Sequence, residues 1–167
     1  LYRFDVNWVT PANSTFTGPV TLPIAAFDTV FPCTPTSRQC IPQPGTTTRV
    51  DILSYRQRPT FRLAYRNFGT HESLVTTQSV EARAGIAGMR WWEIRDPNGT
   101  PVIHQQGTYG PGTTDGIHRW MGSIAMDRLG NMGLGYSVSN GNVVGQGEVY
   151  PGIRYTGRLA SDPLGTM

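Results

Sequence analysis

The chain has 167 residues, enough for one domain with a sizeable hydrophobic core. Only 15% of the residues are charged, and the net charge of +3 comes from 14 arginines spread along the chain, without the basic patch that nucleic-acid binding requires. No apolar run approaches the roughly 18 residues of a transmembrane helix. We therefore expect neither a nucleic-acid partner nor a membrane span.

The first predicted elements are two short strands within residues 1–27, followed by an insertion over residues 28–57. The insertion holds both cysteines, Cys33 and Cys40, in the proline-rich stretch "FPCTPTSRQCIPQPG". No histidine lies near them, and two ligands are too few for a zinc site. We predict a local disulfide, which indicates a secreted or cell-surface location outside the cytoplasm. Two free thiols are the alternative.

Five later stretches are short and rich in aromatic and β-branched residues, and Gly, Pro, Asn or Asp bounds each of them. This pattern is typical of strands. The stretches lie at 89–95, 100–109, 120–127, 132–139 and 150–158. No capped stretch of helical periodicity exceeds about ten residues. Together with 20 Gly and 13 Pro, which suit frequent turns, this predicts an all-β fold.

An internal repeat organises these strands. "RLAYRNFGT" (62–70) aligns with "SIAMDRLGN" (123–131) at an offset of 61 residues, and "GMRW" (88–91) aligns with "GIRY" (152–155) at an offset of 64. "YRF" (2–4) has the same order of a bulky residue, an arginine and an aromatic residue. Each unit is a hairpin, a linker and a second hairpin. Four strands per unit, named A to D, predict the blades of a β-propeller.

The repeat divides one all-β domain, residues 1–167, into about two and a half blades. The predicted parts are strands C and D of a first blade (1–27), the insertion (28–57), a second blade (58–110) and a third, incomplete blade (111–167). Trp91 and Trp92 are adjacent, so both faces of their strand need cover, as stacked blades provide. A β-sandwich is the alternative fold.

Three stretches, "GSIAMDRLGNMGLGYS", "GIRYTGR" and "MRWWEIRDPNGTP", resemble the sialidase-like, Asp-box family of β-propellers. The chain also resembles the propeller regions of large, uncharacterised secreted bacterial proteins. The resemblance covers about residues 60–158. The Asp-box, Ser-x-Asp-x-Gly-x-x-Trp, is matched in part by Asp96, Gly99 and Thr100, without its flanking Ser and its Trp. The resemblance implies the propeller fold and, as one possible activity, glycoside hydrolysis of the sialidase type.

The family's geometry implies that the D–A and B–C connections line the ligand face, whereas the A–B and C–D turns lie opposite. Asp96 and Asp127 then fall in turns, where Asp commonly bonds the backbone. "DRLGN" (127–131) has a single carboxylate, too few for a calcium loop. The candidate ligand-binding residues are Arg62, Arg83, Asp115, His118 and Glu148. The alternative for these residues is that they are solvated loop residues.

The sequence contains no Gly-x-Ser-x-Gly or His-Glu-x-x-His motif. The three histidines fall in different connections or strands, so we expect no metal site and no cofactor. These observations favour a non-catalytic propeller segment with a binding, adhesive or structural role and with a glycan or protein as ligand. A fragment of a sialidase-like glycoside hydrolase is the alternative. Exposed strand edges recruit partners, so we expect further blades of a longer chain, or other copies, to pair with them.

Overall fold

The computed structural model describes residues 1–28, 38–52, 58–83, 85–141 and 147–167. In this part of the chain the predicted all-β class is confirmed. The strands form several antiparallel sheets, none of them closed. The helical elements of this part are one turn of α-helix, α1 (Gly112–Asp115), and one 3₁₀ turn, Pro11–Asn13.

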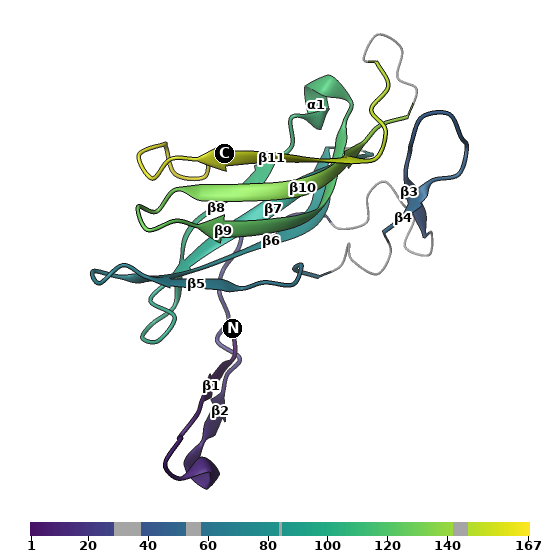
Figure 1. Ribbon diagram of the computed structural model, residues 1–167. Coiled ribbons are helices and arrows are strands. Elements are labelled where there is room, and N and C mark those ends of the chain that lie inside the picture. Colours follow the sequence, from purple (N-terminus) through teal and green to yellow (C-terminus); the bar gives the residue numbers. More distant parts are fainter. Residues whose placement is uncertain (29–37, 53–57, 84, 142–146) are drawn as a thin grey trace.

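Two sheets make up the body of the molecule (Figure 1). The four-stranded sheet has its strands in sequence order, all antiparallel. They are β5 (Ala64–Asn67), β6 (Glu72–Arg83), β7 (Ile86–Arg95) and β8 (Val102–Tyr109). The three-stranded sheet consists of β9 (His118–Met126), β10 (Met132–Ser139) and β11 (Gly152–Arg158). All five strands predicted between 89 and 158 are present, with ends shifted by up to three residues.

The two A–B turns of the repeat have matching backbone conformations. Gly69 and Gly130, which the alignment pairs, have φ angles of 80° and 88°. Glycine adopts such positive angles at little cost because it has no Cβ. In the second turn the Asp127 carboxylate accepts hydrogen bonds from the Leu129 and Asn131 backbone N–H groups at 2.7 and 3.0 Å. The prediction that Asp127 forms the turn is therefore confirmed.

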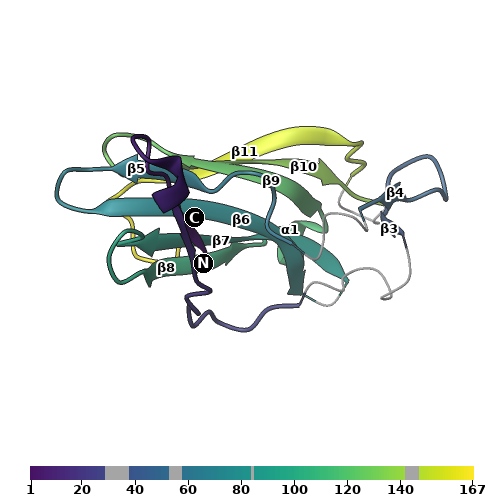
Figure 2. The ribbon, with the colours of Figure 1, turned by 90° about the horizontal axis from the view of Figure 1, so that it is seen from below.

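The main hydrophobic core lies between the two sheets, which form two layers in Figure 2. Period-two alternation points Val75, Met89 and Trp91 from the four-stranded sheet to the inner face. They meet the alternating apolar residues of β9 and β10, among them Ile124 and Leu134. Trp91 is completely buried there. The inner face of each sheet is thus shielded from solvent by the inner face of the other sheet.

Residues within one position of equivalence in the two repeats contact each other. The Thr60 hydroxyl donates a hydrogen bond to the Gly122 carbonyl oxygen at 2.7 Å, across 62 residues of sequence. Arg66 Nε donates to the Met126 carbonyl oxygen at 2.8 Å, across 60 residues. These separations bracket the repeat offset of 61. The first strands of the two units, β5 and β9, therefore lie against each other across the interface between the sheets.

The outer face of the four-stranded sheet is covered by the chain segment 19–28. The Phe27 ring meets the Trp92 ring edge-on, with centroids 5.7 Å apart. The Ala25 N–H donates to Gln106 Oε1 at 3.0 Å. Trp91 and Trp92 are consequently buried on opposite faces, as the double tryptophan predicts. The hairpin of β1 (Arg3–Asp5) and β2 (Thr15–Thr17) projects away from the two sheets (Figure 1).

The described part of the insertion packs beside the α1 end of the sheets. Its strands, β3 (Gln39–Ile41) and β4 (Val50–Asp51), pair with each other. Ile41 and Ile52 are buried together with Trp120 of β9. Cys40 is also completely buried. Its predicted partner, Cys33, lies outside the described residues, so the disulfide stays a prediction.

After β11 the chain turns back toward the four-stranded sheet. The Arg158 guanidinium donates from Nε to the Thr166 carbonyl oxygen at 3.0 Å and from Nη2 to the Asp162 carbonyl oxygen at 2.7 Å. The outer edge of β11 carries no further strand among the described residues. Ile153 and Tyr155 on this strand are 86% and 87% exposed.

Candidate functional site

A cavity of about 180 Å³ opens between the two sheets, at the end where the A–B and C–D turns lie. Phe68 and Leu129, which the repeat alignment pairs, both line it. The other residues around it come from β7, β8, β9, β11, the C-terminal segment and the β5–β6 and β9–β10 turns. They are His71, Glu93, Arg95, His104, Gln105, Met126, Gly130, Arg158, Ala160 and Leu164.

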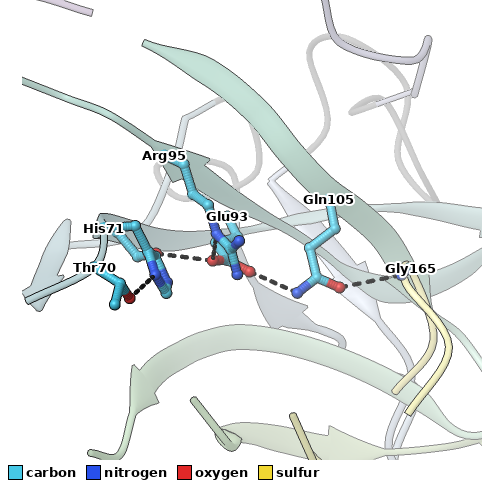
Figure 3. Close-up of polar contacts among 7 residues, drawn as sticks. Thr70, His71, Glu93, Arg95, Gln105 and Gly165 are labelled. Carbon is cyan, nitrogen blue, oxygen red and sulfur yellow. Dashed lines mark hydrogen bonds and ion pairs between the residues drawn. The ribbon is translucent and has the colours of Figure 1, made fainter. Parts of the chain in front are cut away.

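Glu93 is the buried acid of this cavity, with 1% of its side chain exposed. Its Oε1 accepts hydrogen bonds from Ser73 Oγ and Arg95 Nε, both at 2.8 Å, and its Oε2 accepts one from Gln105 Nε2 at 2.6 Å (Figure 3). Gln105 Oε1 in turn accepts from the Gly165 N–H at 3.2 Å. The network ties the C-terminal segment to the four-stranded sheet.

Glu93 stays ionised in this environment. Burial by itself raises the pKa of the carboxyl, but the hydrogen bonds from Gln105, Arg95 and Ser73 together outweigh it and hold the pKa below its ordinary value. Both oxygens are occupied by donors that favour the charged form. Glu93 is therefore a structural anion, and it holds no proton at neutral pH that it could donate to a substrate.

Two histidines line the same cavity. The His71 ring stacks on Phe68, with centroids 4.7 Å apart. Burial is the main reason that the pKa of His104 lies below its ordinary value. Glu93 opposes this lowering, whereas electrostatic interactions with Arg95, His71 and Arg158 add to it.

The sequence-predicted candidates lie at the opposite end of the sheets or on exposed segments. Asp115 belongs to α1, and its carboxylate pairs with Arg119, at 2.7 Å from Oδ2 to Nη2 and 3.2 Å from Oδ1 to Nη1. The Arg119 side chain is 4% exposed, and its guanidinium carbon lies 5.6 Å from the Tyr109 ring centroid and 5.9 Å from that of Tyr136. Asp115 therefore serves as the counter-ion of a buried arginine.

His118 is likewise held by a structural contact. Its Nδ1 accepts a hydrogen bond from the Ala87 N–H at 3.2 Å, and the side chain is buried. Burial, assisted by the charges of Arg49 and Arg119, lowers the pKa of His118 to about 4. The ring is neutral at neutral pH, as its role as hydrogen-bond acceptor requires.

His118 makes the stability of the fold sensitive to acid. The unfolded chain takes up a proton near the ordinary pKa of 6.5, but folded His118 does so only near 4, so the unfolded state binds more protons in between. We expect the free energy of unfolding to fall by about 2–3 kcal/mol across this window. Denaturant titrations at a series of pH values measure it. The His118→Gln variant, which keeps an acceptor for Ala87, should flatten the dependence. If the free energy of unfolding fell equally with pH in the wild type and in His118→Gln, the assignment to His118 would be contradicted.

The remaining candidates are exposed. Arg62 precedes β5 and has a φ angle of 136°, and Arg83 lies at the end of β6. The Glu148 Oε2 atom accepts a hydrogen bond from the Tyr150 hydroxyl at 3.2 Å. Of the five candidates, the structure therefore brings together only Asp115 and His118, which are close in sequence. Asp115 already pairs with Arg119, and His118 already accepts a hydrogen bond from Ala87.

Sequence reasoning missed the cavity. One signal was present, because Glu93 and Arg95 follow Trp91 at period two and so share its inward face. A charged pair on a buried face marks a polar cluster. The other contributors, His71, His104 and Arg158, come from distant parts of the chain and carry no local pattern.

No family model, curated protein or solved structure matches the chain. Within the described ranges no group of three or more His, Cys, Asp or Glu side chains is arranged to hold a metal ion. None of the helices described here has the length and apolar character needed to cross a membrane. The function has to be inferred from the chemistry of the chain itself.

Proposed function

We propose that the chain is a segment of a β-propeller located outside the cytoplasm, with a non-catalytic structural and binding role. In this proposal the four-stranded and three-stranded sheets are consecutive blades. The observation that carries it is a pair of contacts between the first hairpins of the two repeats, Thr60 to Gly122 and Arg66 to Met126. Each of these contacts lies within one residue of the pairing that the alignment gives, and such neighbouring contacts are expected where successive blades stack around an axis.

The contacts of two acids, the buried Glu93 and the half-buried Asp115, support a non-catalytic role. A glycosidase needs two carboxyl groups, or a carboxyl group and a tyrosine, free to act on the bond that is cleaved. Glu93 is held by three donors, and Asp115 is paired with Arg119. Each acid is committed to holding the fold together.

The outer face of the three-stranded sheet supports an assembly role. Ile153 and Tyr155 are exposed there, although their repeat equivalents, Met89 and Trp91, are completely buried between the sheets. The outer face of the four-stranded sheet is already covered by segment 19–28 and is not available to a second copy. In the proposal, the exposed face of β11 in one copy therefore packs against the same face of a second copy, which buries Ile153 and Tyr155 of both.

Sedimentation velocity over a range of concentrations tests the assembly. We expect the chain to self-associate and the double substitution Ile153→Asp, Tyr155→Asp to shift it to monomer, because a charge on a buried apolar face is costly. Tyr150→Asp, at another exposed aromatic residue, is the matched control and should still associate. A wild-type chain that stays monomeric at every concentration would contradict the assembly proposal.

Two further measurements test the rest of the proposal. Fluorogenic sialosides and other glycosides should show no turnover with the purified chain, and saturable turnover would support the hydrolase alternative. Alkylation of the denatured protein without prior reduction should leave Cys33 and Cys40 unmodified, as expected for a disulfide formed outside the cytoplasm, and denaturation is needed because Cys40 is buried in the fold. Two alkylated cysteines would speak against that location.

A further inference from the structure

The cavity between the sheets has two chemically different sides. Arg95, Arg158 and His104 supply basic groups, whereas Phe68 and Leu129 supply apolar surface. The volume of about 180 Å³ is similar to that of cavities of about 150 Å³ that hold a six-carbon ring. This combination suits a ligand with a charged head and a short hydrocarbon body.

Several hydrogen-bond donors on the basic side have no acceptor among the described residues. Arg95 donates to Glu93 through Nε, and no partner within the described residues takes its two Nη groups. Arg158 donates through Nε and Nη2 to carbonyl oxygens of the C-terminal segment, which leaves Nη1. The His104 ring makes no hydrogen bond in the part of the chain that the structure describes. A guanidinium carries five N–H donors, so both arginines can bind a further acceptor.

The charges favour an anion. Arg95 and Arg158 contribute two positive charges and Glu93 one negative charge, which leaves one positive charge uncompensated. The Glu93 oxygens already accept three hydrogen bonds, so a cation would find no free carboxylate. Arginine forms short, charge-assisted pairs with carboxylates, often through two nitrogens.

We propose that this cavity binds a small aliphatic carboxylate of about four to six carbon atoms. The carboxylate binds the free N–H groups of Arg95 and Arg158 and the ring of His104. The hydrocarbon body packs against Phe68 and Leu129. This proposal is independent of the blade assembly, because every group it uses lies within one copy of the chain.

Binding is coupled to protonation of His104. The charged and titratable groups that act on its ring are Glu93, Arg95, His71 and Arg158. A bound anion adds a negative charge to this set and favours the protonated ring. Protonated His104 in turn adds a donor for the carboxylate, so affinity rises as the pH is lowered toward the pKa of His104, which burial holds below its ordinary value.

Titration with sodium butyrate, followed by the ring NMR signals of the histidines, tests the site. We expect saturable shifts of His71 and His104 and stronger binding at pH 5.5 than at pH 7.5. Butylamine, which has the same hydrocarbon chain and the opposite charge, and sodium chloride at equal ionic strength should leave these signals unchanged. Unchanged signals with butyrate, or equal shifts with butylamine or chloride, would overturn the proposal.

Variants separate the roles of the basic groups. Arg95→Gln should weaken butyrate binding about tenfold or more, the effect of losing a charged hydrogen-bond partner. His104→Gln should remove the pH dependence and leave the affinity at pH 7.5 within about threefold of wild type. Arg154→Gln, an exposed arginine outside the cavity, is the control for net charge and should bind as wild type does. Thermal melts confirm that each variant is folded, and equal weakening by Arg154→Gln and Arg95→Gln would contradict the site.

Discussion

Replacing Trp91 by alanine should lower the free energy of unfolding by about 3–5 kcal/mol, the usual cost of removing a large buried aromatic side chain. Trp91 is completely buried at the centre of the core between the sheets. Its removal leaves a cavity that the rigid strands on both sides can fill only in part. Chemical denaturation with a two-state fit measures the loss.

Tyr155→Ala is the matched control, because Tyr155 occupies the equivalent position in the next repeat but is 87% exposed. At concentrations where the chain is monomeric, its effect should stay within about 0.5 kcal/mol. Equal losses for the two substitutions would mean that the equivalent positions have the same surroundings. That result would contradict the arrangement of the two sheets described above.

Asp115→Ala should destabilise the fold by about 3–4 kcal/mol, because it leaves the Arg119 charge buried without its partner. Arg119 is 4% exposed, and Asp115 is the acid that pairs with it, at 2.7 Å. Glu148→Ala removes an exposed acid whose contact is with the neighbouring Tyr150, so its effect should stay within about 0.5 kcal/mol. The measurement is again denaturant unfolding.

A double-mutant cycle sharpens this second test. If Asp115 acts only as the counter-ion of Arg119, the Arg119→Met substitution should recover most of the stability lost in Asp115→Ala. Additive losses would show that Asp115 stabilises the loop by another route, such as its hydrogen bond from the Ile117 N–H. A loss of binding to a glycan without any loss of stability would instead restore Asp115 as a ligand-binding residue.

The strands, their turns and the repeat could be predicted from the sequence, because each depends on local features. The aromatic and apolar residues of β7 predict a strand covered on both faces, and the side-chain period of two places Trp91 and Trp92 on opposite faces. Gly130 and Asp127 identify a turn through their own backbone and side-chain chemistry. The family resemblance also pointed to connections that would face a ligand. Of its candidates, Asp115 and His118 make hydrogen bonds within the fold, and their role in ligand binding stays a prediction.

The cavity was decided by the tertiary structure. Glu93 meets Gln105 through the register between β7 and β8, and Arg158 reaches the same place only because the two sheets pack face to face. A pattern of neighbouring residues cannot specify contacts between side chains that are dozens of positions apart. Whether an acid is a free catalytic group or the counter-ion of a buried arginine depends on the burial of its partner. Asp115 and Arg119 acquire that relation only when Tyr109 and Tyr136 enclose the guanidinium.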